Sequence, residues 1–85
     1  MEVAYSKEAK EDLLHWRKSG DKAVQKKISD LIESIKLSPF EGIGKPESLK
    51  HDLSGAWSRR INGEHRLVYK FDGTDVFILS MRGHY

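Results

Sequence analysis

The chain contains no cysteine among its 85 residues. That absence excludes a disulfide framework, a thiolate zinc site and a thiol nucleophile. The four histidines are spread along the chain without the spacing typical of metal ligands; they are His15, His51, His65 and His84. We therefore expect no metal ion and no other cofactor.

Long apolar segments are also missing. No run approaches the ~20 apolar residues that a membrane-spanning helix needs, and Met1–Tyr5 lacks the apolar run of a signal peptide. We expect a soluble, cytoplasmic protein with no membrane partner. A chain of 85 residues suffices for one small domain that buries roughly 60% of its unfolded surface. Residues 1–85 are therefore expected to form a single domain.

The formal charge of +2 is distributed unevenly along the chain. Residues 1–44 carry eight basic and eight acidic residues, whereas residues 45–85 carry seven basic and five acidic ones. Five cations fall within 22 positions; they are Lys45, Lys50, Arg59, Arg60 and Arg66. A local surplus of this kind suits an anionic partner. Counted alone, it is equally compatible with ordinary solvated surface charge.

The first half of the chain predicts a strand followed by two helices. Residues 2–5 have the pattern of a short strand, and Ser6 can cap a helix over residues 7–18. Gly20 is suited to end that helix. Asp21 can cap a second helix that runs to about Leu37. Each helix has one apolar stripe, which is typical of packing against a sheet.

An exposed loop and three strands are predicted in the second half. The loop runs from Pro39 to Pro46, and Leu49 and Leu53 are expected to attach the following segment to the core. The strands are expected at residues 56–61, 65–71 and 76–81, and the turn sequences between them are Asn62-Gly63 and Asp72-Gly73. The predicted fold is α+β: a mostly antiparallel sheet of four to five strands, with an N-terminal two-helix hairpin packed on one face.

The first hairpin has two possible registers. A two-residue turn at Asn62-Gly63 places Arg59 opposite Arg66, whereas a three-residue turn through Glu64 places Arg60 opposite Arg66. Alternation along the second strand puts the apolar Leu67, Tyr69 and Phe71 on one face. We therefore expect Arg66 to project from the other face, away from the helices.

A carboxylate, an imidazole and basic side chains can together cleave RNA without a metal. A base removes the proton of the 2′-hydroxyl, an acid protonates the departing 5′-oxygen, and cations stabilise the added charge on phosphorus. Glu47 and His84 are the candidate base and acid, and Lys50, Arg60 and Arg66 are the candidate phosphate ligands. Residue types alone leave other readings open: a loop surface acid at Glu47 and a passive C-terminal tail.

Several longer motifs resemble one family. They are Gly44-Lys-Pro-Glu47, Trp57-Ser-Arg-Arg60, Glu64-His-Arg-Leu-Val-Tyr69 and the terminal His84-Tyr85. Together they closely resemble the Txe/YoeB toxins of the RelE/ParE superfamily, and the resemblance covers the second half of the chain almost continuously. Gly83 departs from the family pattern, which has a bulky and often aromatic residue at that position.

The resemblance implies a role for each matching residue. It assigns the general base to Glu47, phosphate contacts to Lys50 and Arg60, a supporting role to Glu64, transition-state stabilisation to Arg66, the general acid to His84 and the final tyrosine to Tyr85. It also implies a ribosome-dependent endoribonuclease that cuts mRNA in the A site of the 70S ribosome. The products would be a 2′,3′-cyclic phosphate and a 5′-hydroxyl, and translation would stop.

The resemblance further implies a cognate antitoxin of the YefM/Phd type, whose C-terminal segment folds on the toxin, and a possible homodimer. One alternative is a non-catalytic inhibitor of DNA gyrase like the ParE branch of the superfamily. A second is an RNA- or antitoxin-binding protein without activity. We expect the ParE branch to lack the set Glu47, Arg66, His84 and Tyr85, so the presence of all four in this chain favours the nuclease.

Overall fold

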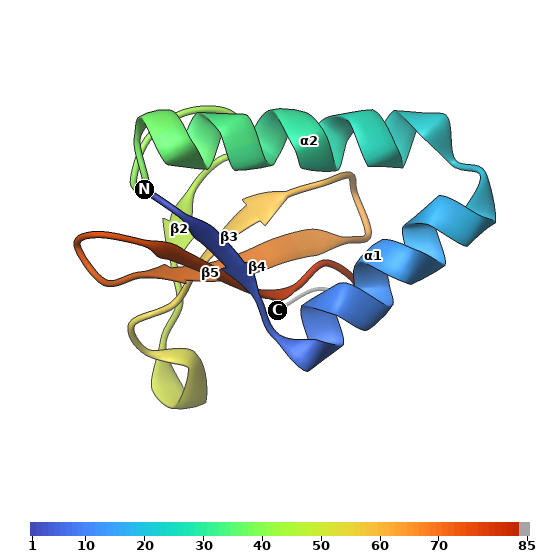
Figure 1. Ribbon diagram of the computed structural model, residues 1–85. Helices are drawn as coiled ribbons and strands as arrows, with labels where there is room; N and C mark the ends of the chain where they lie inside the picture. Colours follow the sequence, from blue (N-terminus) through green and yellow to red (C-terminus); the bar gives the residue numbers. More distant parts are fainter. Residues whose placement is uncertain (84–85) are drawn as a thin grey trace.

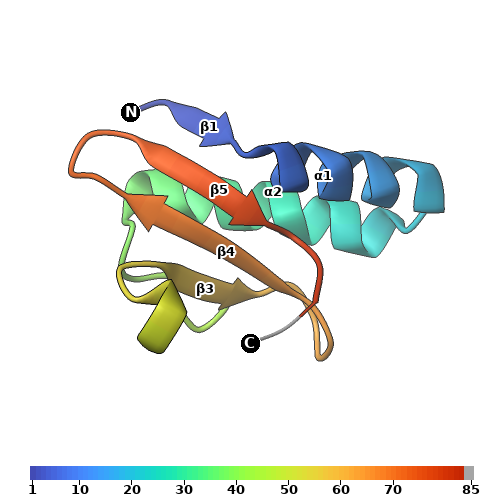
Figure 2. The ribbon, with the colours of Figure 1, turned by 90° about the horizontal axis from the view of Figure 1, so that it is seen from below.

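Two helices cover one face of a five-stranded sheet in the computed structural model, which describes residues 1–83 (Figures 1 and 2). The elements in chain order are β1 (Val3–Tyr5), α1 (Lys7–Ser19), α2 (Lys22–Leu37), β2 (Glu47–Ser48), the short 3-10 helix η1 (His51–Leu53), β3 (Trp57–Arg60), β4 (Arg66–Phe71) and β5 (Val76–Ser80). This arrangement confirms the predicted α+β fold. Neither helix of residues 1–83 combines the length and the apolar character needed to cross a membrane.

The sheet has the strand order β1-β5-β4-β3-β2. Strand β1 runs parallel to β5, and the other three neighbouring pairs are antiparallel. The first and last strands of the chain are therefore side by side, as Figure 2 shows for the ribbon. Strand β2 is only two residues long and directly follows the loop that was predicted to run from Pro39 to Pro46.

Side-chain caps define both helices, as predicted. The hydroxyl of Ser6 accepts a hydrogen bond from the backbone N–H of Ala9 (3.0 Å), and the carboxylate of Asp21 accepts one from that of Val24 (3.1 Å). Gly20 ends α1 with a φ of 75°, a left-handed conformation that glycine adopts without steric cost. The two helices therefore begin and end where local chemistry places them.

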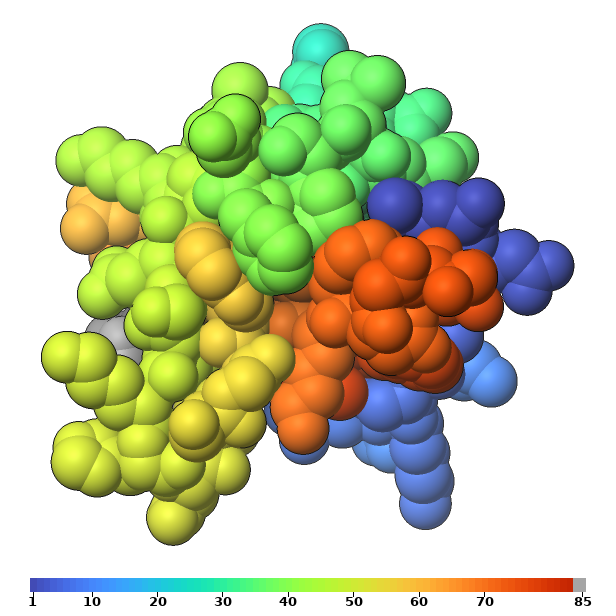
Figure 3. All heavy atoms as spheres, turned by 90° about the vertical axis from the view of Figure 1, so that its left-hand side faces the viewer, coloured from blue at the N-terminus to red at the C-terminus, as the bar shows by residue number. Residues whose placement is uncertain are grey.

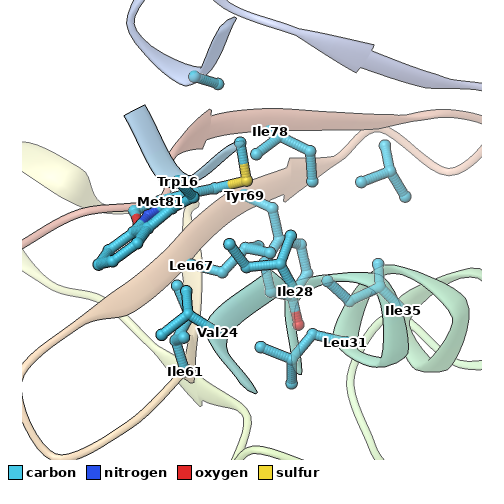
Figure 4. Close-up of a cluster of buried hydrophobic side chains, with 12 residues drawn as sticks. Trp16, Val24, Ile28, Leu31, Ile35, Ile61, Leu67, Tyr69, Ile78 and Met81 are labelled. Carbon is cyan, nitrogen blue, oxygen red and sulfur yellow. The ribbon is translucent and has the colours of Figure 1, made fainter. Parts of the chain in front are cut away.

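The core lies between the helices and the sheet (Figure 4). Leu31 and Ile35 of α2 are fully buried, as are Leu67, Tyr69 and Ile78 of the sheet. The expectation that Leu49 and Leu53 belong to this core is wrong. Both are only half-buried and lie outside the core cluster, because the segment that carries η1 extends on the side of the sheet away from α2 (Figure 1).

Asx-type hydrogen bonds fix both hairpin turns. The side chain of Asn62 accepts from the backbone N–H groups of Glu64 (2.9 Å) and His65 (2.8 Å), and Ile61 N–H donates to the carbonyl oxygen of His65 (2.9 Å). This is the three-residue alternative, so Arg60 is paired with Arg66. In the second turn, hydrogen bonds from backbone N–H groups lower the pKa of the Asp72 carboxyl. The N–H of Asp75 has the largest effect, and that of Thr74 adds to it.

Candidate active site

Strand register brings Glu47, Arg60 and Arg66 to one face of the sheet. Glu47 of β2 is paired with Ser58 of β3, and Arg60, two residues further along β3, is paired with Arg66 of β4. Paired residues and residues two apart share a face. From strand spacing and rise, the Cα atoms of Glu47 and Arg66 lie roughly 12 Å apart. Two long side chains can approach one phosphate group across such a gap.

This face is the one that the helices leave open. Leu67 and Tyr69 alternate with Arg66 along β4, and both belong to the core beneath the helices. Arg66 therefore projects away from the helices, as predicted. The face is not bare throughout, since Val68, beside a bulge in the β4–β5 register, is 1% exposed.

The candidate phosphate ligands have no carboxylate partner among residues 1–83. The ion pairs of this part of the chain are Lys26–Asp30, Lys36–Glu33 and His65–Glu64. Among the described residues, the Arg66 guanidinium donates only to the backbone carbonyl oxygens of Asn62 (2.9 Å) and His65 (3.2 Å). Lys50 and Arg60 are exposed. Their charges are available to an anion from solution.

Glu47 lies close to Lys50 at the edge of the sheet. Both residues line a shallow hollow of about 350 Å³ formed by β2 and the start of η1. Figure 3 shows the segment of residues 45–55, in yellow-green, standing out beside the sheet. The exposed Glu47 carboxylate accepts no hydrogen bond from another described residue, so its oxygens can take up a proton from a ligand.

Glu64 is exposed and faces a histidine. One of its carboxylate oxygens lies 3.5 Å from Nε2 of His65. The His65 ring is itself packed edge-on against the Trp16 indole, with ring centroids 4.9 Å apart. Glu64 therefore lies against His65, whose Nδ1 accepts from the backbone N–H of Gly83.

Two side chains of α1 hold the chain where it leaves β5. The buried carboxylate of Asp12 accepts from the backbone N–H of Met81 (2.8 Å), and the indole N–H of Trp16 donates to the carbonyl oxygen of Met81 (2.8 Å). Neither contact can be read from the local pattern of α1, because Met81 lies 69 positions after Asp12 and 65 positions after Trp16. The structure makes both of them anchors for the C-terminal segment.

A second pair of contacts holds Gly83 beside Arg66 of the candidate site. Its N–H donates to Nδ1 of His65 (2.9 Å), and its carbonyl oxygen accepts from the backbone N–H of Arg66 (2.8 Å). The φ of Gly83 is 81°, which favours glycine over the bulky residue of the family pattern. The predicted His84 and Tyr85 follow Gly83 directly in the sequence, and both lie outside the described residues.

Arg59 is not a surface cation, contrary to its place in the predicted basic cluster. It is 0% exposed, because it lies two positions from Trp57 and from Ile61 and shares their core-facing side of the sheet. This period of two was the signal in the sequence for its burial. Its guanidinium donates to five neutral oxygens at 2.7–3.2 Å. They are the hydroxyl oxygens of Tyr69 and Ser34 and the backbone carbonyl oxygens of Ser38, Glu41 and Ile43.

These contacts fix the loop that precedes Glu47. Burial raises the pKa of the Tyr69 hydroxyl, and the nearby Arg59 guanidinium partly opposes that rise. The neutral hydroxyl of Tyr69 donates to the carbonyl oxygen of Pro39 (2.6 Å). At the other end of the loop, the carbonyl oxygen of Gly44 accepts from the backbone N–H of Arg60 (2.6 Å). The loop is thereby fastened to the strand that carries a candidate phosphate ligand.

Comparison with known proteins identifies relatives over the whole chain. Residues 5–85 match the family described as YoeB-like toxins of bacterial type II toxin-antitoxin systems. The chain is 49% identical to the toxin YoeB of Escherichia coli strain K12 over 85 residues, and the alignment covers all of both proteins.

Two solved structures from Staphylococcus aureus are similar in sequence and in fold. A YoeB dimer is 45% identical with a TM-score of 0.90, over 100% of this chain and 98% of that one. The toxin chain matched in a heterotetrameric YoeB–YefM toxin-antitoxin complex is 46% identical with a TM-score of 0.88, over 98% of this chain and 95% of that one.

Proposed function

Because this chain belongs to the family of YoeB-like toxins of bacterial type II toxin-antitoxin systems, we propose that it is a ribosome-dependent endoribonuclease that cuts mRNA. The observation that carries the proposal is the placement of Glu47, Arg60 and Arg66 on one open face of the sheet. Within residues 1–83, the Glu47 carboxylate has no hydrogen-bond partner and the two guanidiniums have no carboxylate partner. Such groups suit RNA, because a ribose 2′-hydroxyl supplies a proton and the adjacent phosphodiester carries negative charge.

In the proposed reaction, the Glu47 carboxylate takes the proton of a ribose 2′-hydroxyl. The 2′-oxygen forms a bond to the adjacent phosphorus, and the bond from phosphorus to the 5′-oxygen of the next nucleotide breaks. The His84 imidazolium gives its proton to that leaving oxygen, while Tyr85 completes the C-terminal part of the site. Arg60, Arg66 and Lys50 neutralise the charge that accumulates on the phosphoryl oxygens. The products are a 2′,3′-cyclic phosphate and a 5′-hydroxyl.

The ribosome supplies what so small a site lacks. In-line attack requires the 2′-oxygen, the phosphorus and the 5′-oxygen to be aligned, and such orientation contributes several orders of magnitude to the rate. The hollows of about 350 Å³ that residues 1–83 form around these charges are too small to enclose an RNA strand. Ribosomal RNA and the codon in the A site of the 70S ribosome would hold the message in the bent conformation that reacts.

We propose two protein partners by analogy with the S. aureus relatives, whose structures are a dimer and a complex with YefM. The first partner is a cognate YefM/Phd-like antitoxin with a segment that folds on the toxin. The second is another copy of this chain.

Primer extension on a translated message tests the proposed function. We expect new 5′ ends within the reading frame when the protein is added to a translating system, and none when the same message is incubated with the protein alone. The reason is that the message is aligned for cleavage only in the A site. Cutting of free message at the same positions and rate would remove the ribosome from the proposal, and absence of cutting in both reactions would remove the nuclease.

Deleting His84 and Tyr85 is expected to abolish cleavage while the melting temperature stays within about 2 °C of the parent. The core cluster runs from Ala9 to Met81, and the contacts of Met81 and Gly83 remain in the shortened chain. Circular dichroism during heating measures stability, and primer extension measures activity. A large drop in melting temperature would mean that the last two residues serve the fold rather than the chemistry.

A further inference from the structure

A second hollow, lined by basic residues, lies next to the candidate active site. It measures about 350 Å³ and is bordered by α2, the end of the loop before β2, and the β3–β4 turn. Among residues 1–83, its lining includes the cations Lys27, Lys45 and Arg60 and no acidic residue. Three positive charges around one small depression create a positive potential that attracts an anion.

Lys27 contributes a charge that has no counter-ion within residues 1–83. Its neighbour Lys26 forms an ion pair with Asp30 at 2.9 Å. Lys27 is a half-buried residue, and it lines the hollow together with Lys45 and Arg60. A bound anion would provide the missing counter-charge.

The backbone holds Lys45 at this hollow in an unfavourable conformation. Its φ is 52°, in the left-handed region that residues other than glycine rarely occupy. Gly44 before it also has a positive φ, and a Cβ atom there would lie 2.6 Å from a methyl carbon of Leu31. The chain is thus pressed between α2 and β3, and Lys45 is kept close to Arg60. Strain of this type is commonly retained where it serves binding.

We infer that this hollow binds an RNA phosphate group other than the one that is cleaved. The inference rests on the proposed function. Arg60 joins the two places, since it lines the hollow and also shares the open face with Glu47 and Arg66. The positive surface therefore continues from the proposed site of cleavage to this hollow, whose lining within residues 1–83 includes no candidate base. The phosphate belongs either to the message or to ribosomal RNA.

The test compares two double variants with the same change of charge. K27Q/K45Q removes two cations of the hollow, and K26Q/K36Q removes two lysines of α2 that form ion pairs instead. Dissociation constants are measured by fluorescence anisotropy for vacant 70S ribosomes and for ribosomes with mRNA in the A site, at several salt concentrations. We expect K27Q/K45Q to bind about tenfold more weakly than the parent. The slope of its log affinity against log salt concentration should fall by about the amount of one phosphate contact. K26Q/K36Q should bind nearly as the parent does.

The two ribosome states identify the source of the phosphate. Weaker binding of K27Q/K45Q to programmed ribosomes alone assigns the phosphate to the message, and weaker binding to both states assigns it to ribosomal RNA. Equal losses in the two double variants would overturn the inference, because the effect would then be general electrostatics. Failure of the parent itself to bind ribosomes would instead count against the proposed function.

A single variant separates binding from folding. K45G removes the charge and accepts the positive φ without steric cost, so we expect an unchanged or higher melting temperature together with weaker ribosome binding. A lower melting temperature with unchanged binding would show that Lys45 serves only the loop.

Discussion

Replacing Glu47 with alanine is expected to lower the rate of mRNA cleavage by about 10²–10⁴-fold, and replacing His84 with alanine by a similar factor. The first variant loses the group that takes the 2′-proton, and the second loses the group that protonates the leaving oxygen. Glu47 is exposed and accepts no hydrogen bond from another described residue, so its removal leaves the packing intact. Single-turnover cleavage on programmed ribosomes measures both effects.

A matched control for Glu47→Ala is Glu41→Ala. Glu41 is an exposed acid of the loop that precedes β2. It contacts Arg59 through its backbone carbonyl, which the substitution keeps, so this variant is expected to cut like the parent. Induced expression in a bacterial host provides a second readout, in which both active-site variants should permit growth. If each still arrests growth as fully as the parent, nuclease chemistry is not the source of toxicity. A non-catalytic action of the ParE type would then be the better explanation.

Replacing Arg59 with methionine is expected to destabilise the fold by about 3–5 kcal/mol, although methionine is a large apolar residue that suits a buried position. The guanidinium donates to a Tyr69 hydroxyl, a Ser34 hydroxyl and three carbonyl groups of residues 38–43. Methionine donates to none of them, so these acceptors are left unsatisfied or the loop opens to water. Urea unfolding measures the loss, and thermal unfolding should show a melting temperature lower by more than about 10 °C.

The neighbouring arginine provides the control. Arg60→Met removes an exposed side chain, so it should leave stability within about 0.5 kcal/mol of the parent but weaken binding to the ribosome. The two variants differ by one position in β3 and are expected to give opposite results. Equal unfolding midpoints for Arg59→Met and the parent would contradict the structural role assigned to Arg59.

Local signals in the sequence were sufficient for the helices and turns. Ser6 and Asp21 cap their helices and Gly20 ends the first one, because each effect depends on residues within one helical turn. The register of the first hairpin was left with two alternatives. The Asn62 side chain decides between them by accepting two backbone N–H groups, which closes a three-residue turn.

Contacts between distant parts of the chain could not be read in the same way. Periodicity indicates which residues of β1 face inward, but not that this strand pairs in parallel with β5. The candidate site likewise has one part that the sequence indicates and another that only the folded chain shows. Family motifs named Glu47, Arg60 and Arg66, and the sheet register then brought them to one face. The roles of Asp12 and Trp16 depend on Met81, which lies more than sixty positions away.

The adjacency of the first and last strands affects how this protein is made. Among the described strands, β1 pairs with β5 alone, and Ser6 donates from its backbone and its hydroxyl to the carbonyl oxygens of Ile78 and Leu79. Val76, the partner of Val3, is made more than seventy positions later, so β1 of a nascent chain waits for β5 before the sheet is complete. Under the proposed function, a ribosome that is making this protein is therefore protected from its own nascent chain until β5 has been synthesised.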